Sequence, residues 1–87
     1  MKITIEQLKE FCKQGDPKER IDVEDCYTCL TARFARAVGY DVISADYGGV
    51  ETKQGDIEVP MAWAIWNSNA SKESYSYMEL LEVLETL

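Results

Sequence analysis

The chain has 87 residues, of which 46% are hydrophobic and 29% are charged, with a formal net charge of −7 and no histidine. This length predicts one domain, residues 1–87, with a modest core, and the composition is that of an ordinary globular protein rather than a disordered one. No apolar run approaches the roughly 18 residues of a membrane span. Because the commonest general base and metal ligand is missing, we expect a protein that is not an enzyme and that needs no cofactor or metal.

The first residues, MKITIEQLKEF, predict the start of a helix. Thr4 and Gln7 have the spacing of a capping box, and Gly15 is expected to end the helix because glycine tolerates positive φ. The segment lacks the continuous apolar stretch of a signal peptide, and three cysteines are an odd number, whereas small secreted domains usually pair their thiols. We therefore expect a cytoplasmic location.

A second helix is predicted to begin at Asp22 or a neighbour and to end at Gly39. Glu24 and Asp25 would lie in its first turn, where the helix dipole favours negative charge. On a helical wheel one apolar arc holds Val23, Cys26, Tyr27, Leu30, Phe34, Ala37 and Val38. The arc places Cys26 in the core and Cys29 at its margin.

The two cysteines of DCYTCL have the spacing of a redox pair or of half a zinc site. A reactive pair needs a helix N-terminus after a strand to lower the thiolate pKa, but acidic residues precede this one. A zinc site would need Cys12 as a third ligand and a carboxylate as the fourth. The remaining interpretation is that these cysteines pack as small apolar side chains, with Cys12 and Cys26 facing one core.

The stretch YDVISADYGGVET, residues 40–52, predicts a strand, a tight turn at Gly48 and Gly49, and a second strand. The KQGD sequence that follows predicts another turn, and residues 57–59 could form a short third strand. Pro60 ends it.

Residues 61–69, MAWAIWNSN, fit a helix or a strand by periodicity, but Pro60 at the start and the alanines favour a helix. The next residues, SNASKES, predict a polar loop. Ser76 and Glu79 then form a second capping box before a final helix, whose apolar side holds Tyr77, Leu80, Leu81, Leu84 and Leu87. The predicted fold is α+β: two N-terminal helices, a small antiparallel sheet of two or three strands, a short apolar helix and an acidic C-terminal helix.

Negative charge is concentrated in the second half of the chain. Residues 1–40 hold seven bases and seven acids, whereas residues 41–87 hold two bases and nine acids. Such a surface would repel nucleic acid and anionic membranes and attract a protein with a basic surface. The predicted partner-binding residues are Asp41, Asp46, Glu51, Asp56 and Glu58, with Glu79, Glu82 and Glu85 as a second patch. The alternative is that the acids only keep a small protein soluble.

The sequences EDCYTCLTARFARAVGY and VPMAWAIWNS resemble a diffuse class of small proteins found in phages and mobile elements. The resemblance covers roughly residues 22–67, and Cys29 and the acidic final helix depart from it. Small size and acidity are also similar to anti-CRISPR proteins, several of which present carboxylates to a basic nucleic-acid groove.

These similarities imply a non-catalytic, phage-type inhibitor in the cytoplasm of a host cell, which binds a basic host protein that handles nucleic acid. Two alternatives remain. One is an adaptor or oligomerisation module that uses the leucine side of the last helix together with Trp63 and Trp66, although these tryptophans could equally be core residues. The other is a small zinc or thiol protein.

Overall fold

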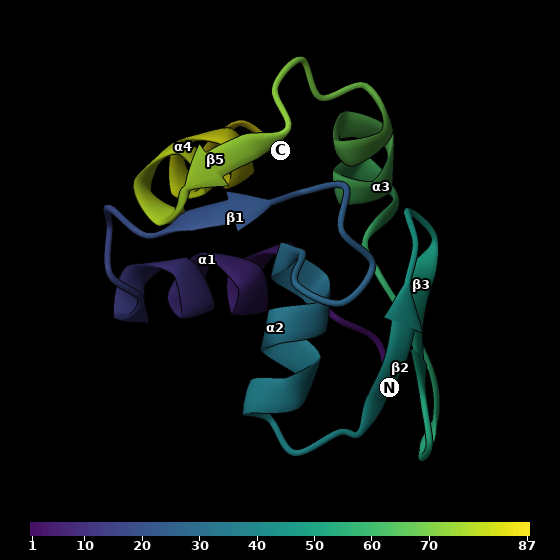
Figure 1. Cartoon of the computed structure of the whole chain (residues 1–87). Coiled ribbons are helices and arrows are strands. Elements are labelled where there is room, and N and C mark those ends of the chain that lie inside the picture. The colour runs from purple at the N-terminus through teal and green to yellow at the C-terminus, as the bar shows by residue number, and fades with distance from the viewer.

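Four helices and five short strands follow one another in the computed structural model, which describes residues 1–87 (Figure 1). In chain order they are α1 (Ile5–Gln14), β1 (Arg20–Asp22), α2 (Leu30–Ala37), β2 (Val42–Ala45), β3 (Gly49–Thr52), β4 (Gly55–Glu58), α3 (Met61–Ser68), β5 (Ser74–Ser76) and α4 (Tyr77–Thr86). The α+β class agrees with the prediction, although the structure has two small sheets where one was expected.

The larger sheet is an antiparallel meander in the order β2–β3–β4, and the smaller one pairs β1 with β5. In the meander Val50 lies opposite Ile57, and Glu51 lies opposite Asp56. The N-terminus runs beside β4, where the Ile3 amide donates to the Glu58 carbonyl at 2.9 Å. In Figure 1 the meander stands at the right, and the smaller sheet lies with α1 and α4 at the left.

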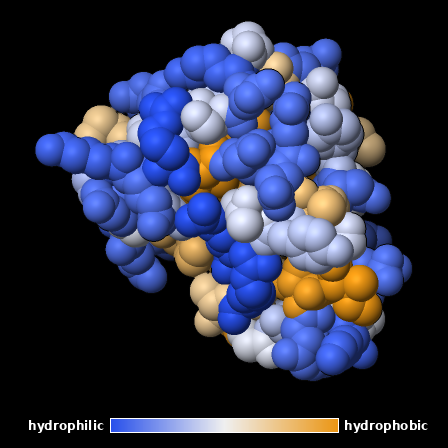
Figure 2. Space-filling model, in the orientation of Figure 1, coloured by the Kyte–Doolittle hydropathy of each residue, from blue (hydrophilic) through white to orange (hydrophobic).

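One apolar cluster of 19 buried residues joins these parts. Helix α1 packs along α4, and α2 packs against β2 and β3. Between the helices, the Phe11 ring meets Phe34 and Tyr77 edge-on, with centroids 5.8 and 6.0 Å apart. Figure 2 shows that hydrophilic side chains cover most of the face turned to the viewer, with an apolar patch at the lower right, over the meander.

Both predicted capping boxes are present. The Gln7 amide donates to Thr4 Oγ1 at 3.1 Å and Gln7 Oε1 accepts from the Thr4 amide at 2.9 Å, and Ser76 and Glu79 do the same at the start of α4. Residues 61–68 are helical, as Pro60 indicated.

The ends of the first two helices differ in mechanism. Gly15 is the C-cap of α1, as predicted, but its φ is −82°, so positive φ is not the reason that the helix ends there. Its lack of a side chain instead makes room for the Tyr77 ring, which a Cβ would approach to 3.1 Å. Gly39 does adopt φ +102° after α2, and the Tyr40 amide donates to the Ala35 carbonyl at 3.0 Å, as in a Schellman motif.

The second helix has Cys29 as its N-cap, seven residues after Asp22, the cap that the sequence predicts. Residues 20–22 are strand β1, and the segment before Leu30 is a series of turns. The carboxylate of Asp25 accepts hydrogen bonds from the amides of Tyr27 and Thr28 at 2.7 and 3.0 Å. Such local side-chain bonds compete with the helix, and pairing with β5 holds the residues before them in an extended strand.

Two boundaries in the second half also differ from the prediction. The first turn of the meander is at residues 46–48, because Gly49 already belongs to β3, and β4 begins at Gly55. The stretch SNASKES is predicted to be a loop, but its last residue, Ser74, begins β5, where Tyr75 is buried opposite Ile21.

The late start of α2 changes the environments of the cysteines. Cys26 is exposed, so the prediction that it lies in the core is wrong, while Cys29 and Cys12 are buried. No three Cys, Asp or Glu side chains are grouped so that they could hold a metal ion.

We expect Cys26 to be the one thiol that reacts readily in the folded protein. Burial shields Cys29 and raises the pKa of the Cys12 thiol to about 11, so that little of its reactive thiolate forms at neutral pH. Mass spectrometry after brief iodoacetamide treatment at pH 7.5 should show one adduct, at Cys26, and three adducts in denaturant. Rapid labelling of Cys12 in the folded protein would contradict the buried position of this side chain on α1.

Candidate functional site

The outer face of the meander carries the carboxylates that the sequence singled out. Along each strand the side chains alternate, so Val50 and Ile57 point into the core, while Glu51 and Asp56 are exposed on the opposite face. Glu58 follows Asp56 by two residues and therefore projects from the same face of β4. The antiparallel register places Glu51 directly opposite Asp56.

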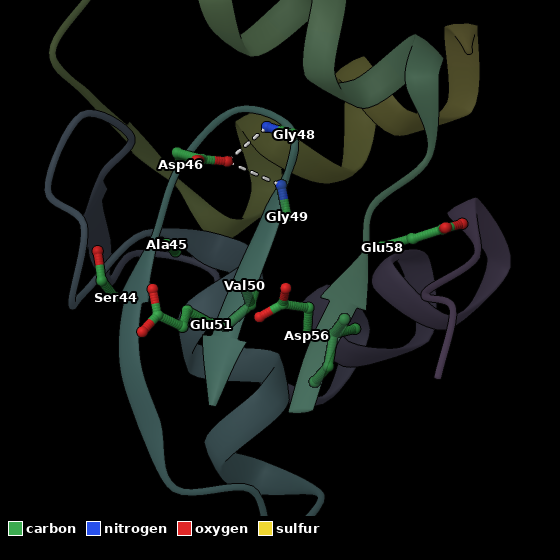
Figure 3. Close-up of a pocket in the computed structure, with 10 residues that line it drawn as sticks. Ser44, Ala45, Asp46, Gly48, Gly49, Val50, Glu51, Asp56 and Glu58 are labelled. Carbon is green, nitrogen blue, oxygen red and sulfur yellow. Dashed lines mark hydrogen bonds between the residues drawn. The ribbon is translucent and has the colours of Figure 1, made fainter. Parts of the chain in front are cut away.

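These residues surround a shallow hollow of about 480 Å³ (Figure 3). Four of the five acids predicted for the hairpin line it, namely Asp46, Glu51, Asp56 and Glu58. Ser44 adds a hydroxyl, and the glycines at positions 48 and 49 add backbone without side chains. Sequence reasoning treated these glycines only as turn residues.

Gly49 has a geometric role at this hollow. A Cβ at this position would lie 2.7 Å from the carbonyl oxygen of Ile57 on β4, a distance at which the strands must move apart. The absent side chain therefore both permits close pairing of β3 with β4 and leaves the upper part of the hollow open.

The negative charge on this face is almost uncompensated. No ion pair in the structure involves Glu51 or Asp56, and Glu58 meets only Lys2, at 4.0 Å and with both side chains well exposed. Like charges directly opposite one another on adjacent strands destabilise a sheet. The register therefore places two like charges opposite one another on the outer face of the meander.

The remaining two acids of the hairpin make contacts within the chain. Asp46 Oδ1 accepts from the amides of Gly48 and Gly49 at 2.8 and 2.9 Å, which shapes the turn (Figure 3). Asp41 lies at the other end of the meander, where Gln54 donates to its carboxylate at 2.7 Å. Asp41 does not line the hollow, so the structure separates it from the other four.

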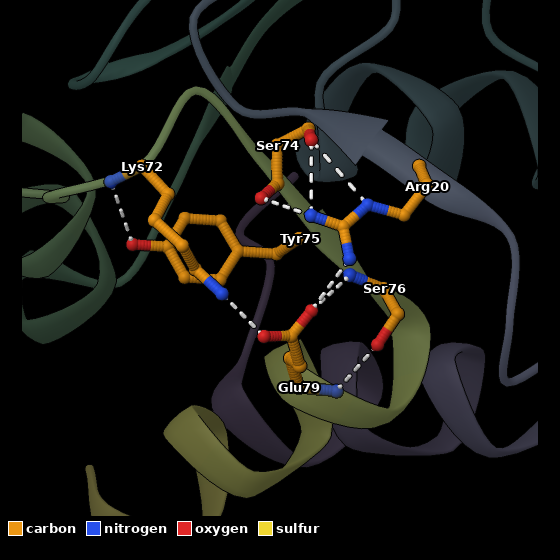
Figure 4. A network of polar contacts seen from close by, with 6 residues as sticks. All are labelled: Arg20, Lys72, Ser74, Tyr75, Ser76 and Glu79. Carbon is orange, nitrogen blue, oxygen red and sulfur yellow. Dashed lines mark hydrogen bonds and ion pairs between the residues drawn. The ribbon is translucent and has the colours of Figure 1, made fainter.

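Glu79 of the predicted second patch is held in a polar network (Figure 4). Arg20 of β1 donates to Glu79 Oε1 at 2.9 Å and to the Ser74 carbonyl at 2.8 Å, and Lys72 pairs with the other carboxylate oxygen. The Lys72 hydrogen bond, followed by that from the Ser76 amide, lowers the pKa of Glu79 to about 2. This carboxylate therefore fastens α4 to the small sheet.

Glu82 and Glu85 are exposed on α4 and form no ion pairs. The helix lies with the small sheet, on the other side of the molecule from the meander (Figure 1). Apart from Asp41, the predicted residues consequently divide between two separate surfaces, and the meander gathers the larger uncompensated group.

The Glu79 network predicts a particular response to acid. The pKa of this group falls from an ordinary 4.5 to about 2 in the folded chain, so its contribution to stability is complete above pH 4.5 and is lost as the pH falls through 2. Thermal unfolding between pH 6 and pH 2 should show a shallower loss of Tm in Glu79→Gln than in the wild type, with the largest difference between the two at pH 6. Glu82→Gln, which lacks those partners, is the control and should follow the wild type.

Trp63 lies in the interior, whereas Trp66 is partly buried and borders a surface hollow together with Tyr75. Trp63 is 2% exposed, and its ring lies 5.1 Å from that of Trp66, which meets Tyr75 at 5.1 Å. The exposed apolar residues of α3 are instead Met61 and Ile65, at 77% and 58% exposure. They are four residues apart and share one side of the helix.

Comparisons of the chain with protein-family models, with curated proteins and with solved structures found no match. None of the four helices combines the length and the apolar character that crossing a membrane requires.

Proposed function

We propose that the chain is a non-catalytic acidic binding protein, whose outer meander face occupies a basic surface on a host protein that handles nucleic acid. In this proposal it is a phage-type inhibitor of a CRISPR-like protein in the cytoplasm of the host cell. The observation that carries the proposal is the group of Glu51, Asp56 and Glu58, which project together from two paired strands with one distant lysine as their only ion partner.

The spacing of these groups suits competition with a polyanion. Carboxylates on opposed residues of adjacent strands are roughly 5 Å apart at the backbone, and alternate residues of one strand are roughly 7 Å apart. A nucleic-acid-binding channel is lined with Lys and Arg side chains, which pair with phosphates and release the counterions of the nucleic acid. A rigid sheet that presents several carboxylates can bind those Lys and Arg side chains with little loss of conformational entropy. Its negative charge also raises the rate at which the two proteins associate.

A displacement assay tests the proposal directly. Purified CRISPR effectors would be loaded with fluorescent nucleic acid, and the fall in anisotropy would be followed as the chain is added. We expect the wild type to displace nucleic acid from at least one effector at low salt, and to do so less well as salt rises. If no effector in a panel covering the main effector types releases its nucleic acid, the inhibitor proposal is wrong.

Met61 and Ile65 support a second candidate function, that of an adaptor or oligomerisation module. It is unusual for two large apolar side chains on one helix face to be so exposed to solvent. Binding through them would persist at high salt and would be lost in Met61→Ser/Ile65→Ser, whereas the acidic-face proposal expects that variant to displace nucleic acid normally. Light scattering of the chain alone would show whether the partner is a second copy.

A further inference from the structure

A second hollow, of about 320 Å³, lies between α3 and α4 and shares no residue with the hollow on the meander face. Two aromatic rings line it, Trp66 from α3 and Tyr75 from β5. The rest of the lining is one side of α4, formed by Glu79, Glu82, Val83 and Thr86. Its volume is at the lower end of the roughly 300–1,000 Å³ of ligand sites.

A cation of the chain itself already binds beside this hollow. The Lys72 side chain crosses the Tyr75 ring, with Nζ 4.6 Å from the ring centroid, and ends at the Glu79 carboxylate (Figure 4). An aromatic face attracts a cation through its quadrupole, and a carboxylate next to the ring adds a charge-assisted hydrogen bond. A ring together with a carboxylate therefore holds an alkylammonium group in this part of the molecule.

One turn further along α4 the same combination recurs without a cation. Trp66 meets Tyr75 with ring centroids 5.1 Å apart, and Glu82 follows Glu79 by three residues on the side of α4 that lines the hollow. Glu82 forms no ion pair, and the cation–π contact of the chain is the one that Lys72 makes with Tyr75. Tryptophan is the ring that attracts cations most strongly, so this pair has an unused capacity for one.

The rest of the lining indicates what kind of cation fits. Val83 is partly buried, and with the methyl group of Thr86 it adds an apolar surface beside the Trp66 ring. Such a surface suits the alkyl stem of a lysine, which buries its methylenes and keeps its ammonium next to a polar partner. Glu82 and Thr86 are exposed, so a side chain can enter past them while its backbone stays outside.

We propose that this hollow binds a lysine side chain of a partner protein, with its ammonium group between the Trp66 ring and Glu82 and its stem against Val83. The inference goes beyond the proposed function, because the site is separate from the acidic meander face and its partner need not handle nucleic acid. The partner is a protein that carries the lysine on an exposed, extended segment.

The test is an NMR titration of the chain, at constant ionic strength, with a blocked Gly-Lys-Gly peptide. We expect a Kd of about 10 mM and shifts of the Trp66 indole N–H and of the backbone amides of Glu82 and Val83. A peptide with norleucine, which keeps an alkyl stem but has no charge, should bind about tenfold more weakly. Equal binding of the two peptides, or shifts confined to residues outside the hollow, would overturn the proposal.

Titration with n-butylammonium identifies the source of the cation. This free amine has the head and stem of a lysine side chain but no peptide backbone. We expect it to bind no more tightly than the lysine peptide, because the head and stem make the contacts. Clearly tighter binding of the free amine would assign the hollow to a small-molecule ligand, and the proposed protein partner would be wrong.

Two matched variants test the placement of the charge. Glu82→Gln keeps the side-chain shape and should weaken the lysine peptide about threefold while leaving the norleucine peptide unchanged. Glu85→Gln makes the same change of net charge on α4 but outside the lining, and it should affect neither peptide. If both variants weaken the lysine peptide alike, only the overall charge attracts it and the site is wrong.

The role of the ring is tested with Trp66→Leu, which keeps a large apolar side chain. It should reduce the preference for lysine over norleucine, and an unchanged preference in a folded variant would contradict the cation–π contact. Glu82 and Glu85 are exposed, so their variants keep the fold and the test does not depend on the stability of Trp66→Leu.

This proposal and the inhibitor proposal fail independently. If the lysine peptide does not bind but the chain displaces nucleic acid from an effector, the lysine site is wrong and the proposed function stands. If the peptide binds with the expected variant effects and no effector is displaced, the hollow is a lysine site in a protein of another function.

Discussion

Replacing Trp63 by alanine is expected to lower the free energy of unfolding by about 3–5 kcal/mol. The indole is buried at 2% exposure and stacks on Trp66, which in turn packs against Tyr75 of β5. Its loss would leave a cavity between α3 and the rest of the core. Because domains of this size are stable by only about 5–15 kcal/mol, the variant would be close to unfolding at 37 °C.

Urea unfolding followed by circular dichroism measures this effect. Ile65→Ala is the control, since Ile65 lies on the same helix at 58% exposure, and its change should stay within about 0.5 kcal/mol. A Trp63→Ala variant as stable as the wild type but unable to bind a partner would show that Trp63 is a recognition anchor, as the adaptor hypothesis expects.

The elements that depend on neighbouring residues were predictable from the sequence. Capping boxes use side chains three residues apart, so Thr4 with Gln7 and Ser76 with Glu79 identified two helix starts correctly. Pro60 identified the third. The hairpin was also recognised, because glycine pairs and β-branched residues are local signals.

The segment from Arg20 to Cys29 was misread because its structure depends on residues far away. Its apolar spacing is helical, yet β1 pairs with β5, and the Arg20 side chain bonds to Ser74, which is 54 positions along the chain. Neither pairing has a local signature. The exposure of Cys26 follows from this one error, since the wheel assumed a helix that starts only at Leu30.

For the candidate site, sequence indicated the residue type but not the grouping. Alternation along strands explains why Glu51, Asp56 and Glu58 share a face. Asp41 and Glu79 look the same in sequence, but Gln54 contacts the first and Arg20 the second, and such partners become visible only in three dimensions.

Neutralising the meander face is expected to slow association with the proposed effector partner about 10- to 100-fold at low salt. The variant Glu51→Gln/Asp56→Asn/Glu58→Gln keeps side-chain shape and removes the three charges that act together. Stopped-flow fluorescence would give the association rate across a series of salt concentrations. The wild-type rate should fall steeply with salt and approach the slow, nearly salt-independent rate of the variant.

The matched control carries Glu73→Gln/Glu82→Gln/Glu85→Gln, which changes net charge equally but leaves the meander intact. If long-range attraction from total charge were sufficient, both variants would slow association alike, and the placement of the carboxylates would be irrelevant. Loss of folding does not explain a slow meander variant, because relieving the opposed Glu51 and Asp56 charges should raise stability by about 0.2–1 kcal/mol. If the meander surface is maintained for binding at the expense of stability, the meander variant should be more stable than the wild type and should associate more slowly. The control variant should keep most of the wild-type association rate.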